Sequence, residues 1–305
     1  MKVGLIGNGG HSKRIQKILK KKNINFFLYK PARPVYYDKK NYAKLKECNV
    51  IFIITPNGTH YNYIKKLCSH RYIFCEKPPV NSHNELNKLK KINSKKIYFN
   101  YNARFSKISE ILKKRNQYKL GNLMHANLVL SHGLAQKKEY KKNWRSNIKK
   151  CPKGVYEVVS THLIDLINFH FNIDKIKKPI LLNHSGIGNS YDSSLSEILL
   201  QNKSTVNIFA TYNSPYSIRY FFLFENGIIE QIDNNLMIKG PAMNLDKKGF
   251  FKKPKLIENY KVNEINDYNI SLEKSVTFFL NKVKKKEFFN KKLFDCALKS
   301  NSLIL

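Results

Sequence analysis

A short apolar strand that runs directly into a glycine-rich turn is the feature that most constrains the fold of this sequence. The strand covers residues 3–6, and the spacing Gly7-x-Gly9-x-x-Ser12 leads from it into an amphipathic helix. A turn of this kind lets the pyrophosphate of a dinucleotide approach the helix N-terminus. Ser12 stands where a third glycine usually allows close packing of helix on strand, and it is small enough for that position. The sequence therefore predicts a dinucleotide-binding turn rather than an ordinary connection.

Short apolar strands and amphipathic helices alternate through the first 120 residues. Such alternation is typical of a parallel sheet with helices on both faces, in the doubly wound arrangement. The expected strands are 3–6, 25–29, 50–55, 72–75 and 97–100, and the expected helices are 12–21, 42–47, 60–69 and 83–92.

The pattern changes after Gly121. A longer strand is expected at 122–131 and a helix at 155–171, followed by strands at 180–183, 195–200, 205–212, 219–225 and 228–232, and by helices at 272–283 and 293–303. Strands grouped in this way are typical of an α+β domain with a mostly antiparallel sheet. Asn226-Gly227 indicates a hairpin between two of the strands. We therefore expect an α/β protein with a doubly wound, dinucleotide-binding domain at 1–120 and an α+β domain with a mostly antiparallel sheet at 121–305.

The net charge of +35 raises the question of a nucleic-acid partner. Of the 56 basic residues only seven are Arg, although Arg makes the bidentate contacts that readers of nucleic acids use. The lysines are scattered along helices, and Asn, which shares A/T-rich codons with Lys, is abundant. Composition drift explains this charge better than a nucleic-acid surface does, so we predict no nucleic-acid partner. The charge can still steer anionic ligands toward the protein.

The five cysteines show no C-x-x-C spacing and no even framework, and we expect them to be reduced thiols. No apolar run is long enough to cross a bilayer, and the first strand begins too early to leave room for a signal peptide. These observations predict a cytoplasmic protein without a membrane partner and without a metal.

Polar residues follow the next two parallel strands at their carboxyl ends, where open α/β sheets bind ligands. One group is Thr55-Pro56-Asn57-x-x-His60, and the other is Glu76-Lys77-Pro78. A lysine held in such a crevice can act as an acid or base, because burial lowers its pKa. The alternative for Lys77 is a surface lysine or an ion pair with Glu76. Any single residue of the first group could equally serve a turn or a helix cap.

The end of the second strand usually offers a carboxylate to the ribose 2′-hydroxyl of NAD. Here the sequence reads Tyr29-Lys30-Pro31-Ala32-Arg33, without a carboxylate. Lys30 and Arg33 could meet a 2′-phosphate, which favours NADP slightly over NAD. The alternative is that both are solvated cations in a lysine-rich chain.

Further along, the helix at 155–171 carries His162, with Asp165 one turn later on the same face. Its other neighbours are apolar, and a lone histidine in such a setting is more often a core residue than a catalytic one. From this helix alone we would favour the core interpretation.

Taken together, these segments resemble the Gfo/Idh/MocA family of NAD(P)-dependent oxidoreductases, which includes glucose–fructose oxidoreductase and inositol dehydrogenase. The matching pieces follow the family order and are GNGGHS at 7–12, TPNGTH at 55–60, EKP at 76–78, NYNARFS at 100–106, NWR at 143–145 and GVYEVVSTHLIDL at 154–166.

The resemblance implies that 1–120 is an NAD(P)-binding Rossmann domain and that 121–305 is a substrate and oligomerisation domain. It also assigns roles to individual residues. It implies that Lys77 and His162 are the catalytic pair on either side of the reacting carbon. Substrate contacts are implied for Asn102, Arg104, Trp144, Arg145 and Asp165. The predicted cofactor contacts, which combine the resemblance with the turn and the strand ends, are Gly7, Gly9, Gly10, His11, Ser12, Lys30, Arg33, Thr55, Pro56, Asn57, His60, Glu76 and Lys77.

One departure from the family concerns the helix histidine. The family often has Asp four residues before it, and here that position is Val158. Glu157 lies one residue away, which would turn it by about 100° around an α-helix and make it a poor substitute. We therefore expect Lys77 to carry more of the acid–base chemistry.

The function that these residues favour is hydride transfer between NAD(P) and a carbinol carbon of a sugar, cyclitol or sugar nucleotide, in a homo-oligomer. A dinucleotide-responsive regulatory protein without turnover is one alternative. Another is an enzyme that uses the same hydride step transiently to cleave a glycoside.

Overall fold

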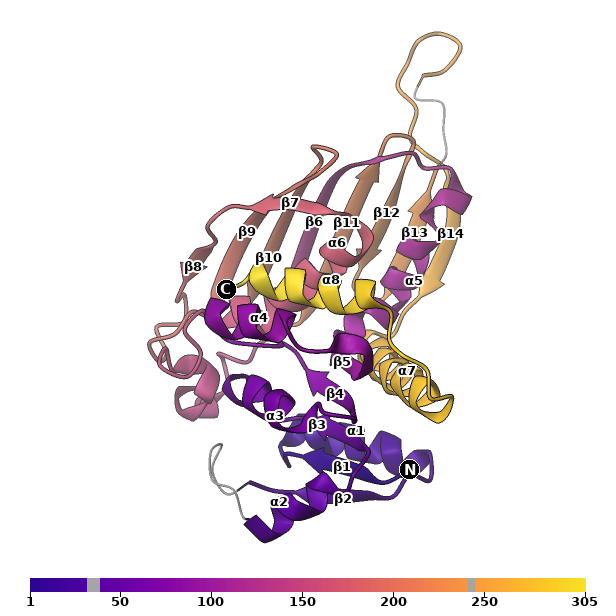
Figure 1. Cartoon of the computed structure of the whole chain (residues 1–305). Helices are drawn as coiled ribbons and strands as arrows, with labels where there is room; N and C mark the ends of the chain where they lie inside the picture. The colour runs from indigo at the N-terminus through magenta and orange to yellow at the C-terminus, as the bar shows by residue number, and fades with distance from the viewer. Residues whose placement is uncertain (32–38, 241–244) are drawn as a thin grey trace. The chain divides into compact units, whose positions relative to one another are not determined.

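The computed structural model describes residues 1–31, 39–240 and 245–305, and these form two compact units. The first unit consists of Met1–Asn102 together with Ile270–Leu305, and the second is Ala103–Asn269. Figure 1 shows the elements of each, which are described separately below. The functional division at residues 120/121 stays a prediction.

The first unit is built on a five-stranded parallel sheet of order β2-β1-β3-β4-β5, which confirms the doubly wound prediction. Parallel register aligns the carboxyl ends, since Ile6 pairs with Ile53, and Ile53 with Cys75. The residues that follow β1, β3 and β4 therefore share one edge of the sheet. The strands are β1 Val3–Ile6, β2 Phe26–Tyr29, β3 Val50–Ile53, β4 Tyr72–Glu76 and β5 Ile97–Asn100.

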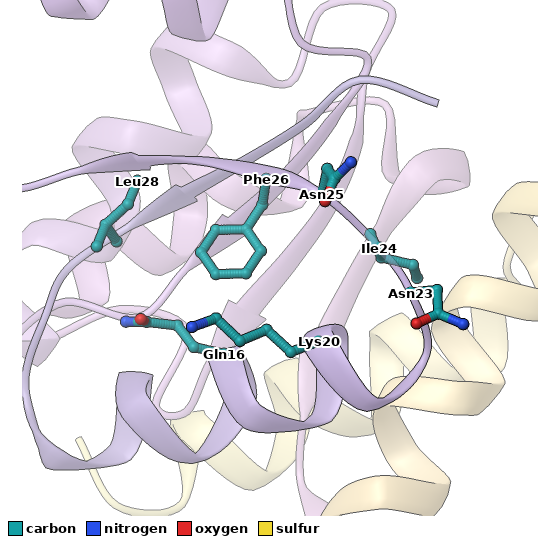
Figure 2. Close-up of a pocket in the computed structure, with 7 residues that line it drawn as sticks. All are labelled: Gln16, Lys20, Asn23, Ile24, Asn25, Phe26 and Leu28. Atoms are coloured by element: carbon teal, nitrogen blue, oxygen red, sulfur yellow. The ribbon is translucent and has the colours of Figure 1, made fainter.

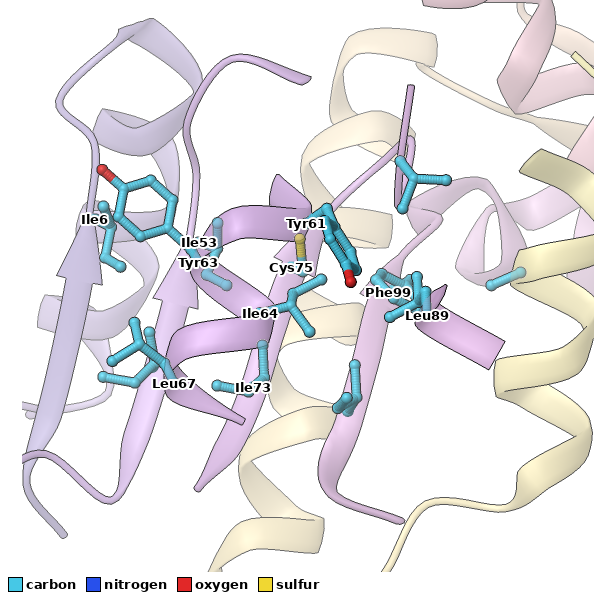
Figure 3. Packing of buried hydrophobic residues seen from close by; sticks show 14 of the residues in the cluster. Ile6, Ile53, Tyr61, Tyr63, Ile64, Leu67, Ile73, Cys75, Leu89 and Phe99 are labelled. Carbon is cyan, nitrogen blue, oxygen red and sulfur yellow. The ribbon is translucent and has the colours of Figure 1, made fainter. Parts of the chain in front are cut away.

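Helices α1 Gly10–Lys21, α2 Lys39–Lys46, α3 His60–Leu67 and α4 His83–Lys90 connect these strands. Strand residues alternate between the two faces of the sheet because the side-chain period is two. Ile53, Ile73 and Phe99 face one core, where they pack with Ile64 and Leu89 of the covering helices (Figure 3). All five are less than about a tenth exposed, as this core requires.

The other face of the sheet packs against aromatic rings of helix α7, Glu264–Lys284. The ring centroid of Phe279 lies 5.3 Å from that of Phe52 and 5.4 Å from that of Phe74. Phe52 and Phe74 occupy the strand positions between the residues of the first core, so a single alternating pattern supplies both cores.

Helix α8, Lys291–Ser302, returns the end of the chain to the first unit. Phe294 joins the core with Phe99, with ring centroids 5.6 Å apart. Asn301 accepts a hydrogen bond from the backbone N–H of Val80 at 2.9 Å and donates one to its carbonyl at 3.1 Å. The chain that follows Glu76-Lys77-Pro78 is therefore fixed by the C-terminal helix.

A nine-stranded, mostly antiparallel sheet forms the second unit, as expected for an α+β domain. Its order is β14-β13-β12-β11-β6-β10-β9-β7, with β8 paired to β9, and β10 runs parallel to β6. The strands are β6 Leu123–Ser131, β7 Ile173–Ile176, β8 Ile180–Leu182, β9 Ser193–Leu200, β10 Thr205–Thr211, β11 Ser217–Phe224, β12 Gly227–Ile232, β13 Asn235–Lys239 and β14 Leu256–Lys261.

The hairpin prediction is confirmed with a shift of one residue. Strands β11 and β12 pair antiparallel, with Phe224 opposite Gly227, so the two-residue turn is Glu225-Asn226. Gly227 is already in the strand, where a Cβ atom would lie 2.3 Å from the carbonyl oxygen of Lys239. The glycine is needed for this close approach of two strands.

The helix expected at 155–171 is two kinds of helix in succession. Tyr156–Ser160 is a π-helix, and α6 covers Thr161–His170. Helix α5, Lys107–Lys113, packs beside α6 within the same unit. No helix among the described residues is long and apolar enough to span a membrane.

Candidate functional site

The glycine-rich turn after β1 has the geometry that an anionic group needs. Gly7 has φ of +108°, and a Cβ there would lie 2.1 Å from the carbonyl oxygen of Ile54, so only glycine fits. A Cβ at Gly9 or Gly10 would meet nothing within 4 Å. The turn is therefore tight where it faces the sheet and open where a ligand would approach.

Helix α1 begins at this turn without any side chain that caps it. Gly9 is the N-cap residue and makes no side-chain cap bond, and the first turn of the helix holds no acidic residue. The first N–H groups of a twelve-residue helix are thus left to bind an anion. The Ser12 hydroxyl donates a 2.7 Å bond to the carbonyl of Gly7, which fixes the turn from within.

Glu76, at the end of β4, is held by two neighbours on the same sheet edge. Its Oε1 atom accepts a bond of 2.7 Å from Nδ2 of Asn100 and lies 2.8 Å from Nε2 of His11. Burial disfavours the ionised carboxylate, but the charge and hydrogen bond of His11, the bond from Asn100 and the charge of Lys77 outweigh burial and lower the pKa of Glu76. The carboxylate is therefore ionised near neutral pH.

A chain of hydrogen bonds fixes Asn100 from behind. Its Oδ1 accepts a 2.6 Å bond from the hydroxyl of Ser275 on α7, and that hydroxyl lies 2.8 Å from the Tyr98 hydroxyl. All three are buried, so this network sets the orientation of the amide that binds Glu76. The sequence motifs included Asn100 but gave no sign of Ser275, which is 175 residues away along the chain.

His60 links the ends of two strands rather than standing at a surface. Its Nε2 lies 2.9 Å from the carbonyl oxygen of Thr55 and its Nδ1 lies 2.8 Å from that of Pro78. The side chain is fully buried, which lowers the pKa of His60, while the two carbonyls and Glu76 act in the opposite direction. A neutral imidazole donates only one hydrogen bond, so burial and the two acceptors compete for its protonation. Contact of His60 with a cofactor stays a prediction.

The Thr55-Pro56-Asn57 turn is a compact, partly exposed loop. The hydroxyl of Thr59 lies 2.6 Å from that of Thr55 and 2.8 Å from the carbonyl oxygen of Pro56. Pro56 is exposed and Asn57 is half-buried at the start of a 3₁₀ turn, Asn57–Thr59. These bonds hold the loop on the ligand-facing edge of the sheet.

Lys77 is half-buried and directly follows the last residue of β4. Its charge acts on Glu76, where it lowers the pKa, and on His60, where it lowers the pKa as well. The structure therefore brings Lys77 together with two of the predicted cofactor residues.

Lys30 is exposed immediately after β2, at the same edge as the glycine turn. Arg33, its predicted partner in binding a 2′-phosphate, lies outside the described residues. The choice between NADP and NAD stays a prediction.

The π-helix changes the register of the residues before His162. The backbone N–H of Thr161 bonds to the carbonyl of Tyr156, five residues back instead of four. A π-turn places residues i and i+5 above one another, as an α-turn does for i and i+4. Relative to His162, Glu157 therefore lies on the side of the helix where Val158 would lie if the whole segment were α-helical. The objection that Glu157 is turned away by about 100° does not hold here, since it assumed α-helical geometry throughout.

Glu157 and Val158 lie in different surroundings. Val158 packs on a core cluster that contains Tyr140 and Tyr212. Glu157 is half-buried and interacts with Cys151, whose pKa it helps to raise after the larger effect of burial. The apolar side chain thus packs against this core cluster, whereas the acidic one interacts with Cys151 and Lys153.

Arg104 and Asp165 bind each other. Nε of Arg104 lies 2.8 Å from Oδ2 of Asp165, and the second guanidinium bond, to Oδ1, is 2.6 Å. Both side chains are almost fully buried, at 4% and 0% exposure, and the guanidinium lies 5.0 Å from the ring centre of Phe169. The fork of this arginine is thus already engaged with a carboxylate. Substrate contact by either residue stays a prediction.

The other predicted substrate residues are placed differently. Nδ2 of Asn102 donates a 2.9 Å bond to the buried hydroxyl of Ser271 within the first unit. Trp144 is 38% exposed, and the guanidinium of Arg145 lies 4.5 Å from its ring centre in the second unit. Arg145 is half-buried.

A groove lies along α1 and β2 (Figure 2), and one of its lining residues, Gln16, donates a 3.1 Å bond to the Ser12 hydroxyl. The ring of Phe26 lies beside Leu28 of the strand and faces the side chains of Gln16 and Lys20 on the helix. None of the predicted site residues lines this groove.

In the described part of the chain, no group of three or more His, Cys, Asp or Glu side chains could hold a metal ion.

Comparisons with known proteins agree with this geometry. Residues 9–99 match the model of an oxidoreductase family with an NAD-binding Rossmann fold, the same family that the motifs resemble. The resemblance is therefore confirmed for the dinucleotide-binding part of the chain. Among curated proteins, none matches the chain significantly.

Solved structures share the fold over the whole chain at low identity. A levoglucosan dehydrogenase in complex with NADH has a TM-score of 0.79 at 13% identity, covering 100% of this chain and 95% of that one. A myo-inositol dehydrogenase from Corynebacterium glutamicum scores 0.72 at 14%, covering 100% and 94%. A putative NADPH-dependent oxidoreductase from Desulfitobacterium hafniense scores 0.77 at 12%, covering 100% and 93%. These likenesses establish the fold of both units.

Proposed function

We propose, starting from a Rossmann domain that belongs to the Gfo/Idh/MocA family of oxidoreductases, that this protein transfers a hydride between NAD(P) and a carbinol carbon. The observation that carries the proposal is the open, uncapped glycine turn beside an ionised Glu76 on one sheet edge. The turn suits a pyrophosphate, and a carboxylate suits ribose hydroxyls. When bound, the nicotinamide supplies the carbon that accepts or returns the hydride.

The residues of the chain provide the proton chemistry. In the oxidation direction Lys77, in its neutral form, takes the hydroxyl proton while the carbinol C–H electron pair leaves as hydride, so the product is a carbonyl compound. In reduction the same ammonium returns the proton. Its place beside Glu76 and His60 fits this role, because the charge and polarity around a lysine determine which protonation form it takes.

We propose that His162 binds the reacting hydroxyl and that Glu157 orients this histidine. The π-turn gives Glu157 the phase of a residue one α-helical turn before His162. A carboxylate there would hold the imidazole in one tautomer and favour its protonated form. In this scheme the buried pair of Arg104 and Asp165 stabilises the second unit.

For the substrate we propose a sugar, a cyclitol or a sugar nucleotide. Several proteins of the same fold are described as dehydrogenases of levoglucosan, myo-inositol and scyllo-inositol, at 13–14% identity. The cofactor is NAD(P), and exposed Lys30 gives NADP a slight advantage. We also propose a cytoplasmic homo-oligomer with no nucleic-acid or membrane partner. The free thiols of all five cysteines are consistent with a reducing compartment.

Titration of the protein with NADH and NADPH, followed by cofactor fluorescence, tests the first step. Gly9→Ala and Gly10→Ala add a methyl group in open space, so the melting temperature should stay within about 2 °C of wild type. The same methyl group would occupy the place of the pyrophosphate, so affinity should fall by about tenfold or more. Unchanged affinity in both variants would refute a dinucleotide at this turn.

A regulatory protein that binds the cofactor without turnover is the second candidate, and it would share the glycine turn. This candidate would be supported if the protein binds NADH but oxidises no member of a panel of sugars and cyclitols. Transient hydride transfer in glycoside cleavage would instead give product without net change in NADH.

A further inference from the structure

Two buried tyrosines in the second unit bring their hydroxyl groups close to Arg145. Tyr140 is 1% exposed and Tyr212 is 0% exposed; in the described part of the chain the Tyr140 hydroxyl has no hydrogen-bond partner, and the Tyr212 hydroxyl has only the Arg145 guanidinium beside it. Their rings form one contact, with centroids 6.1 Å apart at an interplanar angle of 72°. A buried hydroxyl without a partner costs free energy, so its presence calls for a ligand or an ordered water.

Arg145 stands beside these hydroxyls with its charge unmatched. It acts on both phenols, lowering the pKa of each against the larger raising effect of burial. Among described residues no carboxylate lies within ion-pair distance of its guanidinium, which lies 4.5 Å from the centre of the Trp144 ring and beside the Tyr212 hydroxyl. A half-buried arginine without a counter-ion is costly, and most of its five N–H donors remain to be satisfied.

Arg145 is the positively charged member of this cluster, because the groups beside it are neutral or already hydrogen-bonded elsewhere. The His132 ring lies 4.8 Å from that of Tyr212, and burial together with Arg145 lowers the pKa of His132, so its imidazole is neutral near pH 7. Asp192 also acts on Tyr140, but its carboxylate is occupied by the backbone N–H groups of His184 and Ser185 and by a hydroxyl. The anion that would neutralise Arg145 is thus missing from the cluster.

We infer that Arg145, with the hydroxyls of Tyr140 and Tyr212, binds an oxyanion of the substrate, so that the preferred substrate is an acidic sugar or polyol. A guanidinium binds a carboxylate or phosphate through two parallel bonds, and the phenol O–H groups can donate to the same oxygens. The inference rests on the proposed function, because it names the class of substrate for the same reaction. A sugar acid and a sugar phosphate present the same recognisable chemistry.

The test measures binding of three probes to the NADH-saturated protein by calorimetry. The probes are galacturonate, glucose 6-phosphate and uncharged galactose, with acetate and inorganic phosphate as small-anion controls. We expect at least one acidic sugar to bind about tenfold or more tightly than galactose, and comparison of the two acids identifies carboxylate or phosphate as the anion. Equal affinity for galactose and both acids would overturn the inference.

Single substitutions distinguish a specific anion-binding site from non-specific attraction by the protein's positive charge. Arg145→Gln should remove the preference for the acid, whereas Lys149→Gln, which removes an exposed charge four residues away, should leave it intact. Equal losses in the two variants would assign the preference to charge steering and refute the site. Tyr212→Phe deletes only the hydroxyl, so it should weaken acid binding several-fold without lowering the melting temperature.

The outcomes for the two proposals are distinguishable. NADH affinity is measured in the same samples before the probes are added, and it depends on the first unit. Loss of NADH binding in wild type would refute the proposed function, while intact NADH binding with no acid preference would refute only the anion site.

Discussion

Nε2 of His11 lies 2.8 Å from Oε1 of Glu76, so the first turn of α1 is tied to the end of β4. The glycine turn and the Glu76 carboxylate at the end of β4 are therefore connected by a direct contact. His11 contributes the largest favourable effect on the pKa of Glu76, ahead of Asn100 and Lys77. This makes His11 a positioning residue for a predicted cofactor site.

His11→Ala should lower the free energy of unfolding by about 1 kcal/mol at pH 7, because a partly buried bond to an ionised carboxylate is lost. The pKa of Glu76 is lowered in the folded protein, so its stabilisation is present above its ordinary pKa of 4.5 and is lost as the pH falls below it. The difference between variant and wild type should therefore shrink toward pH 4 in urea titrations. His83→Ala, at an exposed histidine of α4, is the control and should have no such effect.

The buried pair of Arg104 and Asp165 should behave as a structural unit. Removing one partner leaves an unpaired buried charge, so Arg104→Met or Asp165→Leu alone should cost about 3–5 kcal/mol in urea unfolding. The double variant should recover a large part of that loss. If instead both single variants keep wild-type stability and raise only KM, the pair contacts substrate as the family resemblance implies.

His170 should make the second unit sensitive to acid. Burial, with Lys113, Arg115 and Arg104 nearby, lowers its pKa from 6.5 to about 3. The hydroxyl of Ser109 donates to the carbonyl of Arg104, so it accepts from Nε2–H of the neutral histidine.

A histidine with a lowered pKa contributes full stability above its unfolded pKa near 6.5, and stability declines as the pH falls from there toward 3. We expect a loss of about 1–2 kcal/mol at pH 5 relative to pH 7 in wild type. His170→Gln should flatten this dependence. A variant whose profile between pH 7 and 5 remains as steep as that of wild type would show that other groups cause it.

The orienting role of Glu157 predicts a kinetic signature. Glu157→Gln should reduce kcat by about tenfold with little change in KM, and should shift the acidic limb of the kcat profile, because the imidazole loses a carboxylate partner. Val158→Ala is the matched neighbour. It should lower stability by about 1 kcal/mol through lost packing and leave the pH profile unchanged. A pH profile of Glu157→Gln that coincides with wild type would contradict the role.

The parallel sheet was predictable because each of its strands is a short apolar run, and all of them except β2 are buried on both faces. The strands β7, β13 and β14 were not predicted. In β13 buried residues alternate with half-buried ones, as in Asn235-Leu236-Met237-Ile238, whereas β7 has one buried residue and β14 has none. All three are stabilised by pairing within the sheet. Such strands carry a weak sequence signal.

The predicted site likewise has features that the local sequence reveals and features that depend on tertiary packing. The glycine turn, the Thr55-Pro56-Asn57 loop and Lys77 lie on one sheet edge because parallel strands in register must align their ends. The pairing of Arg104 with Asp165 and the π-turn before His162 depend on tertiary packing, so no local pattern revealed them. The cluster of Arg145 with the hydroxyls of Tyr140 and Tyr212 likewise becomes visible only in three dimensions.

The central claim is that Lys77 moves the proton of the reacting hydroxyl. Lys77→Met keeps the length of the side chain and removes its charge, and it can be tested with the best substrate of the sugar, cyclitol and sugar-acid panel. Single-turnover formation of NADH or NADPH should fall by about 10²-fold or more, while the affinity for the cofactor in a fluorescence titration stays within about threefold. A variant that forms reduced cofactor at the wild-type rate would contradict the account.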